Sequence, residues 1–245
     1  VLDIYVPAGN ARRPLVLYIH GGGWFAGHTR QSGAFANFPR VLAALAAEGF
    51  TVASLEYRLS GEARFPAQLR DVNAAVRFLR ANAAQYRIDP SRVGLWGGSA
   101  GGHLTALAAL TCRNTALDPA AASDACVQAA VPWYAITDFA TMPRIAEPGS
   151  PEQRLFGCEG GPCDAPITRD ASPVSHVDAS DPAILLIHGV EDKVVPLAQS
   201  QELEAAMKRA GAPVRSLYIA NVDHSFIGKT PQVTRHASLQ AINAT

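Results

Sequence analysis

The five residues Gly97-Gly98-Ser99-Ala100-Gly101 constrain the fold of this chain more than any other segment. They fit the pattern G-x-S-x-G, with an apolar run at Val93–Trp96 before them and a helical pattern at Ala100–Leu110 after them. A serine on such a tight strand-to-helix turn is held in strained geometry, with its hydroxyl exposed above the sheet. The glycines are needed because side chains on either side would collide across the turn. The segment therefore predicts a nucleophilic serine, Ser99, at the edge of a sheet.

Short apolar, β-branched runs alternate with longer helical patterns, which is typical of a mostly parallel central sheet flanked by helices. The expected strands are Leu2–Val6, Leu15–Ile19, Thr51–Leu55, Val93–Trp96, Val127–Val131, Ile184–His188 and Val214–Ile219. The expected helices are Phe38–Glu48, Ala67–Ala84, Ala100–Leu110, Gln199–Ala210 and one that begins near Pro231. Residues 133–181 are rich in Pro, Gly and Asp and lack clear periodicity, so we expect a small cap that folds over the sheet.

We expect residues 1–245 to form a single domain, because the cap is too short and irregular to fold as a second one. The chain opens at Val1 inside an expected strand, so we expect that an earlier strand or a signal peptide has been trimmed. Targeting is therefore not read directly from this end of the sequence.

Composition excludes several classes of protein. The 245 residues carry 21 basic and 21 acidic side chains, and 48% of them are hydrophobic. Disorder requires low hydrophobicity and high net charge, so it is excluded. A nucleic-acid partner is not expected, because no excess of Lys and Arg is available to displace counterions. No membrane partner is expected either, since no apolar run approaches the ~20 residues that cross a bilayer. Oligomeric state is not predicted.

The four cysteines predict two local disulfides, Cys112 with Cys126 and Cys158 with Cys163. A zinc site is the alternative, but no spacing is C-x-x-C and no histidine lies near enough to complete a site. Reduced core thiols are a second alternative, although Cys158 and Cys163 lie in a loop rich in Gly and Pro. Disulfides imply a secreted or periplasmic protein.

The segment His20-Gly21-Gly22-Gly23-Trp24 directly follows the expected strand Leu15–Ile19. A tetrahedral oxyanion needs backbone N–H donors that converge on one point, and glycines let the main chain approach that closely. We expect Gly22, Gly23 and the amide of Ala100 to form this oxyanion hole. Phosphate binding is the alternative, but neither G-x-G-x-x-G nor a G-K-[ST] ending occurs here. His20 is expected to hold the loop by hydrogen bonds.

An acid and a histidine follow the serine along the chain where such a turn occurs in a parallel α/β sheet. Asp192 comes just after the expected strand Ile184–His188, with Glu191 as the neighbouring alternative. His224 comes just after the next strand, Val214–Ile219. The candidate triad Ser99, Asp192 and His224 thus falls on one edge of one sheet. In this triad the serine attacks a carbonyl, the histidine moves its proton and the aspartate fixes the imidazole tautomer. We expect no metal and no organic cofactor.

Three aromatic residues are candidates for substrate binding. Trp24 belongs to the Gly-rich loop, and Trp133 and Tyr134 follow the expected strand Val127–Val131 at the same edge of the sheet. Packing in the core is the alternative for Trp133 and Tyr134. A small cap favours an open site that accepts short acyl chains or bulky alcohol groups.

The chain resembles the hormone-sensitive-lipase-like branch of the α/β-hydrolase carboxylesterases, particularly small bacterial feruloyl and acetylxylan esterases. The matching segments are 2–7 (LDIYVP), 20–24 (HGGGW), 56–59 (EYRL), 65–67 (FPA) with Asp71, 89–92 (DPSR), 98–103 (GSAGGH), 171–173 (ASP) and 188–192 (HG-x-x-D). The resemblance implies an α/β-hydrolase fold and the same triad of Ser99, Asp192 and His224. It implies hydrolysis of short-chain acyl or hydroxycinnamoyl esters, small or carbohydrate-linked, including acetyl or feruloyl esters of plant polysaccharide.

Two other functions remain as alternatives. Amidases and peptidases share the serine turn, although their specificity usually needs a further large domain. A non-catalytic binding protein of the same fold normally has a broken triad, whereas all three triad residues are present here. The related kynurenine formamidases usually carry an aromatic residue where Gly23 stands, and this difference favours esters over formamides.

Overall fold

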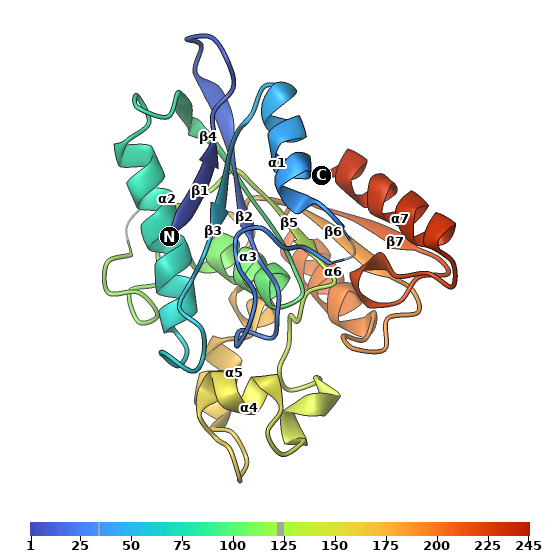
Figure 1. The fold of residues 1–245 in the computed structure, drawn as a ribbon. Coiled ribbons are helices and arrows are strands. Elements are labelled where there is room, and N and C mark those ends of the chain that lie inside the picture. The colour runs from blue at the N-terminus through green and yellow to red at the C-terminus, as the bar shows by residue number, and fades with distance from the viewer. Residues whose placement is uncertain (34, 122–124) are drawn as a thin grey trace.

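A computed structural model describes residues 1–33, 35–121 and 125–245 of the chain. Its described strands form one seven-stranded sheet in the order β1-β3-β2-β4-β5-β6-β7 (Figure 1). Only β1 is antiparallel to its neighbour among these strands; the remaining pairs are parallel. The strands are β1 (Leu2–Tyr5), β2 (Arg13–Ile19), β3 (Thr51–Leu55), β4 (Ile88–Gly98), β5 (Ala129–Trp133), β6 (Ala183–Gly189) and β7 (Val214–Ile219). This sheet confirms the predicted α/β-hydrolase architecture.

Helices cover both faces of the sheet, as the alternating pattern predicts. Buried side chains of α2 (Ala67–Ala81), α3 (Ala100–Thr111) and α6 (Ala198–Ala210) belong to one apolar cluster. Those of α1 (Phe38–Ala47) and α7 (Pro231–Ala244) belong to a second cluster on the opposite face (Figure 1). Because both faces of a parallel sheet are covered, its strands are apolar without alternation, and all five residues of β3 are buried.

The segment between β5 and β6 is the predicted cap. It holds two helices, α4 (Pro151–Phe156) and α5 (Ala165–Asp170), and two 3₁₀ turns, η2 (Pro143–Ala146) and η3 (Pro173–His176). Figure 1 shows α4 and α5 together at one end of the molecule. The cap is fixed to the body by apolar packing and a backbone hydrogen bond: the Phe65 and Phe156 rings lie 6.0 Å apart, and the Phe65 N–H donates to the Leu155 carbonyl over 3.0 Å.

Element boundaries differ most from the prediction in β4 and β5. β5 begins and ends two residues later than the expected Val127–Val131, so it includes Trp133. β4 extends from Ile88 to Gly98, well beyond the expected Val93–Trp96, because its first residue, Ile88, already pairs with Arg13 of β2. Because of the shift in β5, Trp133 is the last residue of that strand and Tyr134 is the first residue beyond it.

The two predicted disulfides are present. Cys112–Cys126 closes the loop that follows α3, and Cys158–Cys163 closes the loop that follows α4. No helix in residues 1–33, 35–121 and 125–245 combines the length and the apolar character needed to cross a membrane.

Candidate active site

Ser99 lies on the turn between β4 and α3 with φ of 57°, a left-handed conformation that only glycine adopts without strain. Neighbouring glycines make this turn possible. A Cβ on Gly97 would lie 2.6 Å from the Ile19 carbonyl oxygen, and one on Gly101 would overlap the same oxygen. The Ser99 N–H donates to the Trp133 carbonyl over 2.9 Å, which ties the turn to the end of β5. The predicted strained serine at the sheet edge is therefore observed.

Ser99, His224 and Asp192 form one hydrogen-bonded chain. The distance from Ser99 Oγ to His224 Nε2 is 3.0 Å, and that from His224 Nδ1 to Asp192 Oδ2 is 2.7 Å. A carboxylate only accepts hydrogen bonds, so Nδ1 carries the proton and Nε2 is free to accept the serine hydroxyl. In this arrangement His224 can remove a proton from Ser99, and Asp192 can stabilise the resulting imidazolium.

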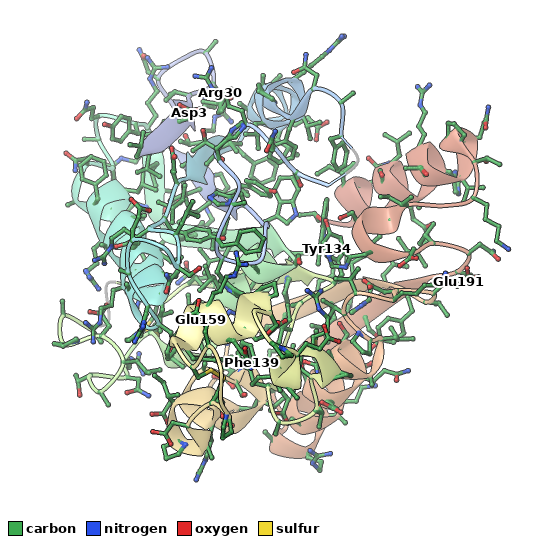
Figure 2. The ribbon with its side chains drawn as sticks, turned by 60° about the horizontal axis from the view of Figure 1, so that its bottom comes forward. Asp3, Arg30, Tyr134, Phe139, Glu159 and Glu191 are labelled. Carbon is green, nitrogen blue, oxygen red and sulfur yellow. A yellow bond between two sulfur atoms is a disulfide. The ribbon has the colours of Figure 1, made fainter. Side chains whose placement is uncertain are left out.

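Asp192 is held as an anion in a buried position. Its side chain is wholly buried, and its Oδ1 accepts the N–H groups of Val194 and Val195 at 2.9 and 2.8 Å. Burial alone raises the pKa of a carboxyl, but the hydrogen bonds from His188, His224 and Val195 outweigh it and hold the Asp192 pKa below its ordinary value. The neighbouring Glu191 is exposed and lies away from Tyr134 in Figure 2, whereas Asp192 is the acid that contacts His224.

The loop after β2 lies directly against the serine turn. A Cβ on Gly21 would lie 2.8 Å from the Gly98 carbonyl oxygen and 3.4 Å from the Ser99 Cβ. The loop turns sharply because the Ala26 N–H donates to the Gly22 carbonyl over 3.1 Å. Hydrogen bonds among the described residues do not use the N–H of Gly22, Gly23 or Ala100 as a donor. These three amides are therefore available beside the serine.

His20 fixes the start of this loop, as predicted. Its Nδ1 donates to the Gly21 carbonyl over 2.7 Å, and its ring stacks on Tyr57 at 4.3 Å. The Tyr57 hydroxyl in turn donates to the His20 carbonyl over 3.1 Å. Burial lowers the pKa of His20, which keeps the ring neutral and suits a structural role.

A cavity of about 890 Å³ opens above Ser99 and His224. Three segments form its walls: the loop from Tyr18 to Ala36, the cap between Ile136 and Glu152, and the loop around Val195. The wall includes both apolar and charged side chains, among them Phe25, Met142, Arg30, Arg144 and Glu152. A cavity of this kind accommodates an ester with a small apolar part and a polar part.

The three predicted substrate-binding aromatics have different positions. Tyr134 lines the cavity, with its ring 4.7 Å from that of His224, and it is central in Figure 2. Trp24 belongs to the cavity wall, but its side chain is buried and its Nε1–H donates to His103 Nδ1 over 3.1 Å.

The prediction that Trp133 binds substrate is wrong. Its side chain is fully buried in the apolar cluster beneath α1 and α7, and its Nε1–H donates to Thr245 Oγ1 over 3.1 Å. Its ring packs against that of Trp96 at 4.8 Å. Trp133 ends β5 with its side chain on the face opposite α3, so packing in the core, the alternative reading, is the correct one.

Two buried histidines have contacts that the sequence did not reveal. His103 on α3 accepts from Trp24, and its Nε2–H donates to the Ala171 carbonyl in the cap over 2.8 Å. The Nε2 of His188, near the end of β6, lies 3.3 Å from Oδ2 of Asp192. The spacing of four residues in the HG-x-x-D segment is the only signal in the sequence that points to this second contact.

In the described parts of the chain, no three His, Cys, Asp or Glu side chains are grouped as a metal site would require.

Comparisons with known proteins agree with this geometry. Residues 2–207 match the model of the BD-FAE family. Esterase LipQ of Mycobacterium tuberculosis is 34% identical over 222 residues, which cover 89% of this chain and 52% of that protein. The chain spans about half the length of the curated relatives it matches.

Solved structures of esterases superpose on nearly the whole chain. A truncated carbohydrate esterase from gut microbiota superposes with a TM-score of 0.79 at 32% identity, covering 98% of this chain and 90% of that one. An esterase of Thermogutta terrifontis with bound propionate superposes with a TM-score of 0.78 at 25% identity, covering 99% and 87%.

Proposed function

This chain belongs to the BD-FAE family, and we propose that it is a carboxylesterase that uses Ser99 as its nucleophile. The observation that carries the proposal is the unbroken hydrogen-bonded chain from Ser99 through His224 to Asp192, at the floor of an open cavity. A binding protein of the same fold would not need this chain intact. Relatives named as esterases support the same reaction.

The proposed reaction has two halves. In the first, Ser99 Oγ bonds to the ester carbonyl carbon while His224 Nε2 takes its proton, and the C=O electron pair moves onto oxygen. The N–H groups of Gly22, Gly23 and Ala100 stabilise that oxyanion. The bond to the alcohol oxygen then breaks, and His224 returns the proton to the leaving alcohol.

In the second half, a water molecule attacks the acyl–Ser99 ester and His224 takes a proton from that water. The tetrahedral intermediate forms at the same amides and collapses with loss of Ser99 Oγ, which regains the proton. The products are one carboxylic acid and one alcohol, and no redox partner is consumed. Asp192 stays ionised throughout and stabilises the imidazolium in both halves.

For the substrate, we propose short-chain acyl or hydroxycinnamoyl esters, including acetyl or feruloyl groups on plant polysaccharide. The mixed apolar and charged wall of the cavity supports an alcohol part with hydroxyl groups. The similarity to a carbohydrate esterase from gut microbiota supports the same substrate class. We also propose that the protein is secreted or periplasmic, since disulfides form and persist mainly in oxidising compartments.

Hydrolysis of p-nitrophenyl esters from acetate to decanoate tests the proposal, with the protein and its Ser99→Ala variant side by side. We expect turnover of the short esters, and a loss of at least about 10⁴-fold in kcat in the variant. Release of acetate or ferulate from xylan then tests the substrate class. Turnover of simple esters without release from xylan would restrict the proposal to small esters. A folded protein that cleaves no ester would refute it, and amides would then be tested.

A further inference from the structure

His188 has no part in the mechanism above, yet it is wholly buried against the acid of the triad. Its Nε2 lies 3.0 Å from the Val195 carbonyl oxygen and 3.3 Å from Asp192 Oδ2. Its Nδ1 lies 2.7 Å from the hydroxyl of Ser200 on α6. The side chains of His188 and Asp192 are both fully excluded from solvent. Every polar atom of this imidazole is therefore used by the protein.

These partners determine which nitrogen of the His188 ring donates toward Asp192. A carbonyl and a carboxylate oxygen accept hydrogen bonds and do not donate them, so Nε2 carries the hydrogen. Nδ1 is hydrogen-bonded to the Ser200 hydroxyl over 2.7 Å, which fixes the orientation of the ring. The Nε2–H donates to the Val195 carbonyl over 3.0 Å, and Asp192 Oδ2 lies 3.3 Å from the same nitrogen.

The two oxygens of Asp192 are held differently. Oδ1 is fixed by two backbone N–H groups, whereas Oδ2 has the two histidines, His224 at 2.7 Å and His188 at 3.3 Å. Both imidazoles thus approach the oxygen that would stabilise the charged form of the catalytic histidine. In a buried site, hydrogen bonds to one oxygen polarise and compete with one another.

On the basis of the function proposed above, we infer that His188 is a positioning residue: held by Ser200, it orients Asp192 and limits the negative charge that Asp192 offers to His224. Without the N–H of His188, Oδ2 would interact more strongly with the imidazolium form of His224. The catalytic base would then be lost to protonation at a higher pH. Asp192 would also lose one of the contacts that fix its plane.

The surroundings contain few other groups that could produce the same effect. Three titratable groups lie near His188 and His224: Tyr134 after β5, Tyr218 opposite His188 on β7, and Asp223 beside His224. Of these, Asp223 is paired with the exposed Lys193. Tyr134 does not ionise near neutral pH, because burial raises its pKa. Burial also raises the pKa of Tyr218, and the hydrogen bond from its hydroxyl to Glu204 raises this pKa further.

The test compares kcat, KM and the full pH profile of p-nitrophenyl acetate hydrolysis in wild type, His188→Phe, His188→Gln and Ser200→Ala. Phe fills the site without an N–H, whereas Gln keeps a donor toward Asp192. His236→Gln, which changes an exposed histidine on α7, is the matched control. We expect His188→Phe to lower kcat about 10- to 100-fold with little change in KM. We also expect the acid limb of its profile to move up by about half a pH unit or more.

His188→Gln should recover most of the rate and the wild-type acid limb, and Ser200→Ala should shift the limb in the same direction by less. A folded His188→Phe protein whose acid limb stays at the wild-type pH would overturn the inference, whatever its kcat, because a residue that only packs does not move that limb. If His188→Phe does not fold, Ser200→Ala decides: a wild-type limb and rate in that variant would equally overturn it.

A second readout does not depend on turnover. The His224 Nδ1–H proton, bonded to Asp192, gives a downfield NMR resonance that should move when His188 is replaced by Phe or Ser200 by Ala, and should not move in His236→Gln. An unchanged resonance in both would contradict the inference even if no ester is cleaved. Absence of ester turnover in wild type refutes only the proposed function, so the two failures are distinguishable.

Discussion

The indole Nε1–H of Trp24 donates to His103 Nδ1 over 3.1 Å, and neither side chain is accessible to solvent. Because the Nε2–H of the same imidazole donates to the Ala171 carbonyl, one ring joins the loop after β2, helix α3 and the cap. Trp24 directly follows Gly22 and Gly23, so this bond also fixes the amides beside Ser99. An indole N–H can only donate, which requires His103 to be neutral.

The neutral state of His103 makes the stability of the fold depend on pH. Burial lowers the pKa of His103 to about 4, whereas an unfolded histidine titrates near 6.5. Between these values the unfolded chain binds the extra proton, so stability falls as the pH is lowered. The His103→Gln variant, which keeps a donor and an acceptor but does not titrate, should lose about 3 kcal/mol less than wild type between pH 7 and pH 4.

Urea unfolding at pH 7, 6, 5 and 4 measures this difference. His236→Gln is the control, because an exposed histidine should leave the pH dependence of wild type unchanged. Parallel curves of unfolding free energy against pH for wild type and His103→Gln would contradict the prediction, because they would mean that folding does not lower the pKa of His103.

Gly101 is a position where an added methyl group should be strongly destabilising. Its Cβ would overlap the Ile19 carbonyl oxygen and lie 2.5 Å from that of His20, and neither backbone group can move cheaply. We expect Gly101→Ala to cost at least about 3 kcal/mol of unfolding free energy. Activity should fall as well, because β2 leads into the loop that faces Ser99.

Gly61→Ala is the matched control, since a Cβ there meets no atom within 4 Å. It should change stability by no more than about 0.5 kcal/mol. Chemical denaturation of both variants gives the comparison. A Gly101→Ala protein as stable as Gly61→Ala would mean that β2 and α3 are not in close contact.

Trp133 and Tyr134 are adjacent in sequence but should respond differently to mutation. Trp133→Phe removes the bond to Thr245 and part of the core, so it should cost about 1–3 kcal/mol of stability and leave KM unchanged. Tyr134→Leu removes a ring that contacts His224 at the cavity wall, so kcat/KM should fall by about tenfold or more. Ester kinetics and urea melts on both variants measure this. An increase in KM for Trp133→Phe would return Trp133 to the substrate pocket.

The triad could be predicted from sequence because it depends on one rule of topology. Parallel strands end at the same edge of a sheet, so Asp192 and His224, which follow β6 and β7, had to lie near Ser99. The side of the sheet to which Trp133 points could not be predicted in this way. Both faces of a parallel sheet are buried, and an apolar strand therefore carries no alternation that separates one face from the other.

The contacts of His188 and the helices of the cap were beyond the sequence for a different reason. His188 depends on Ser200, which only the packing of α6 brings within 2.7 Å. The helices α4 and α5 have six residues each, less than two turns, so their apolar residues cannot form a periodic pattern.

The two disulfides should stabilise the fold to different extents. Cys112–Cys126 joins residues 14 apart and Cys158–Cys163 residues 5 apart, and the loop-entropy model assigns a larger effect to the longer loop. Replacing the first pair by serine should cost about 3 kcal/mol, and replacing the second about 2 kcal/mol. The second pair directly follows α4, whose first residues line the cavity, so its loss should also change KM for bulky esters. Urea melts and ester kinetics on the two double variants test both expectations. A larger loss of stability from the shorter loop would mean that packing of the cap, and not loop entropy, determines the effect of that disulfide.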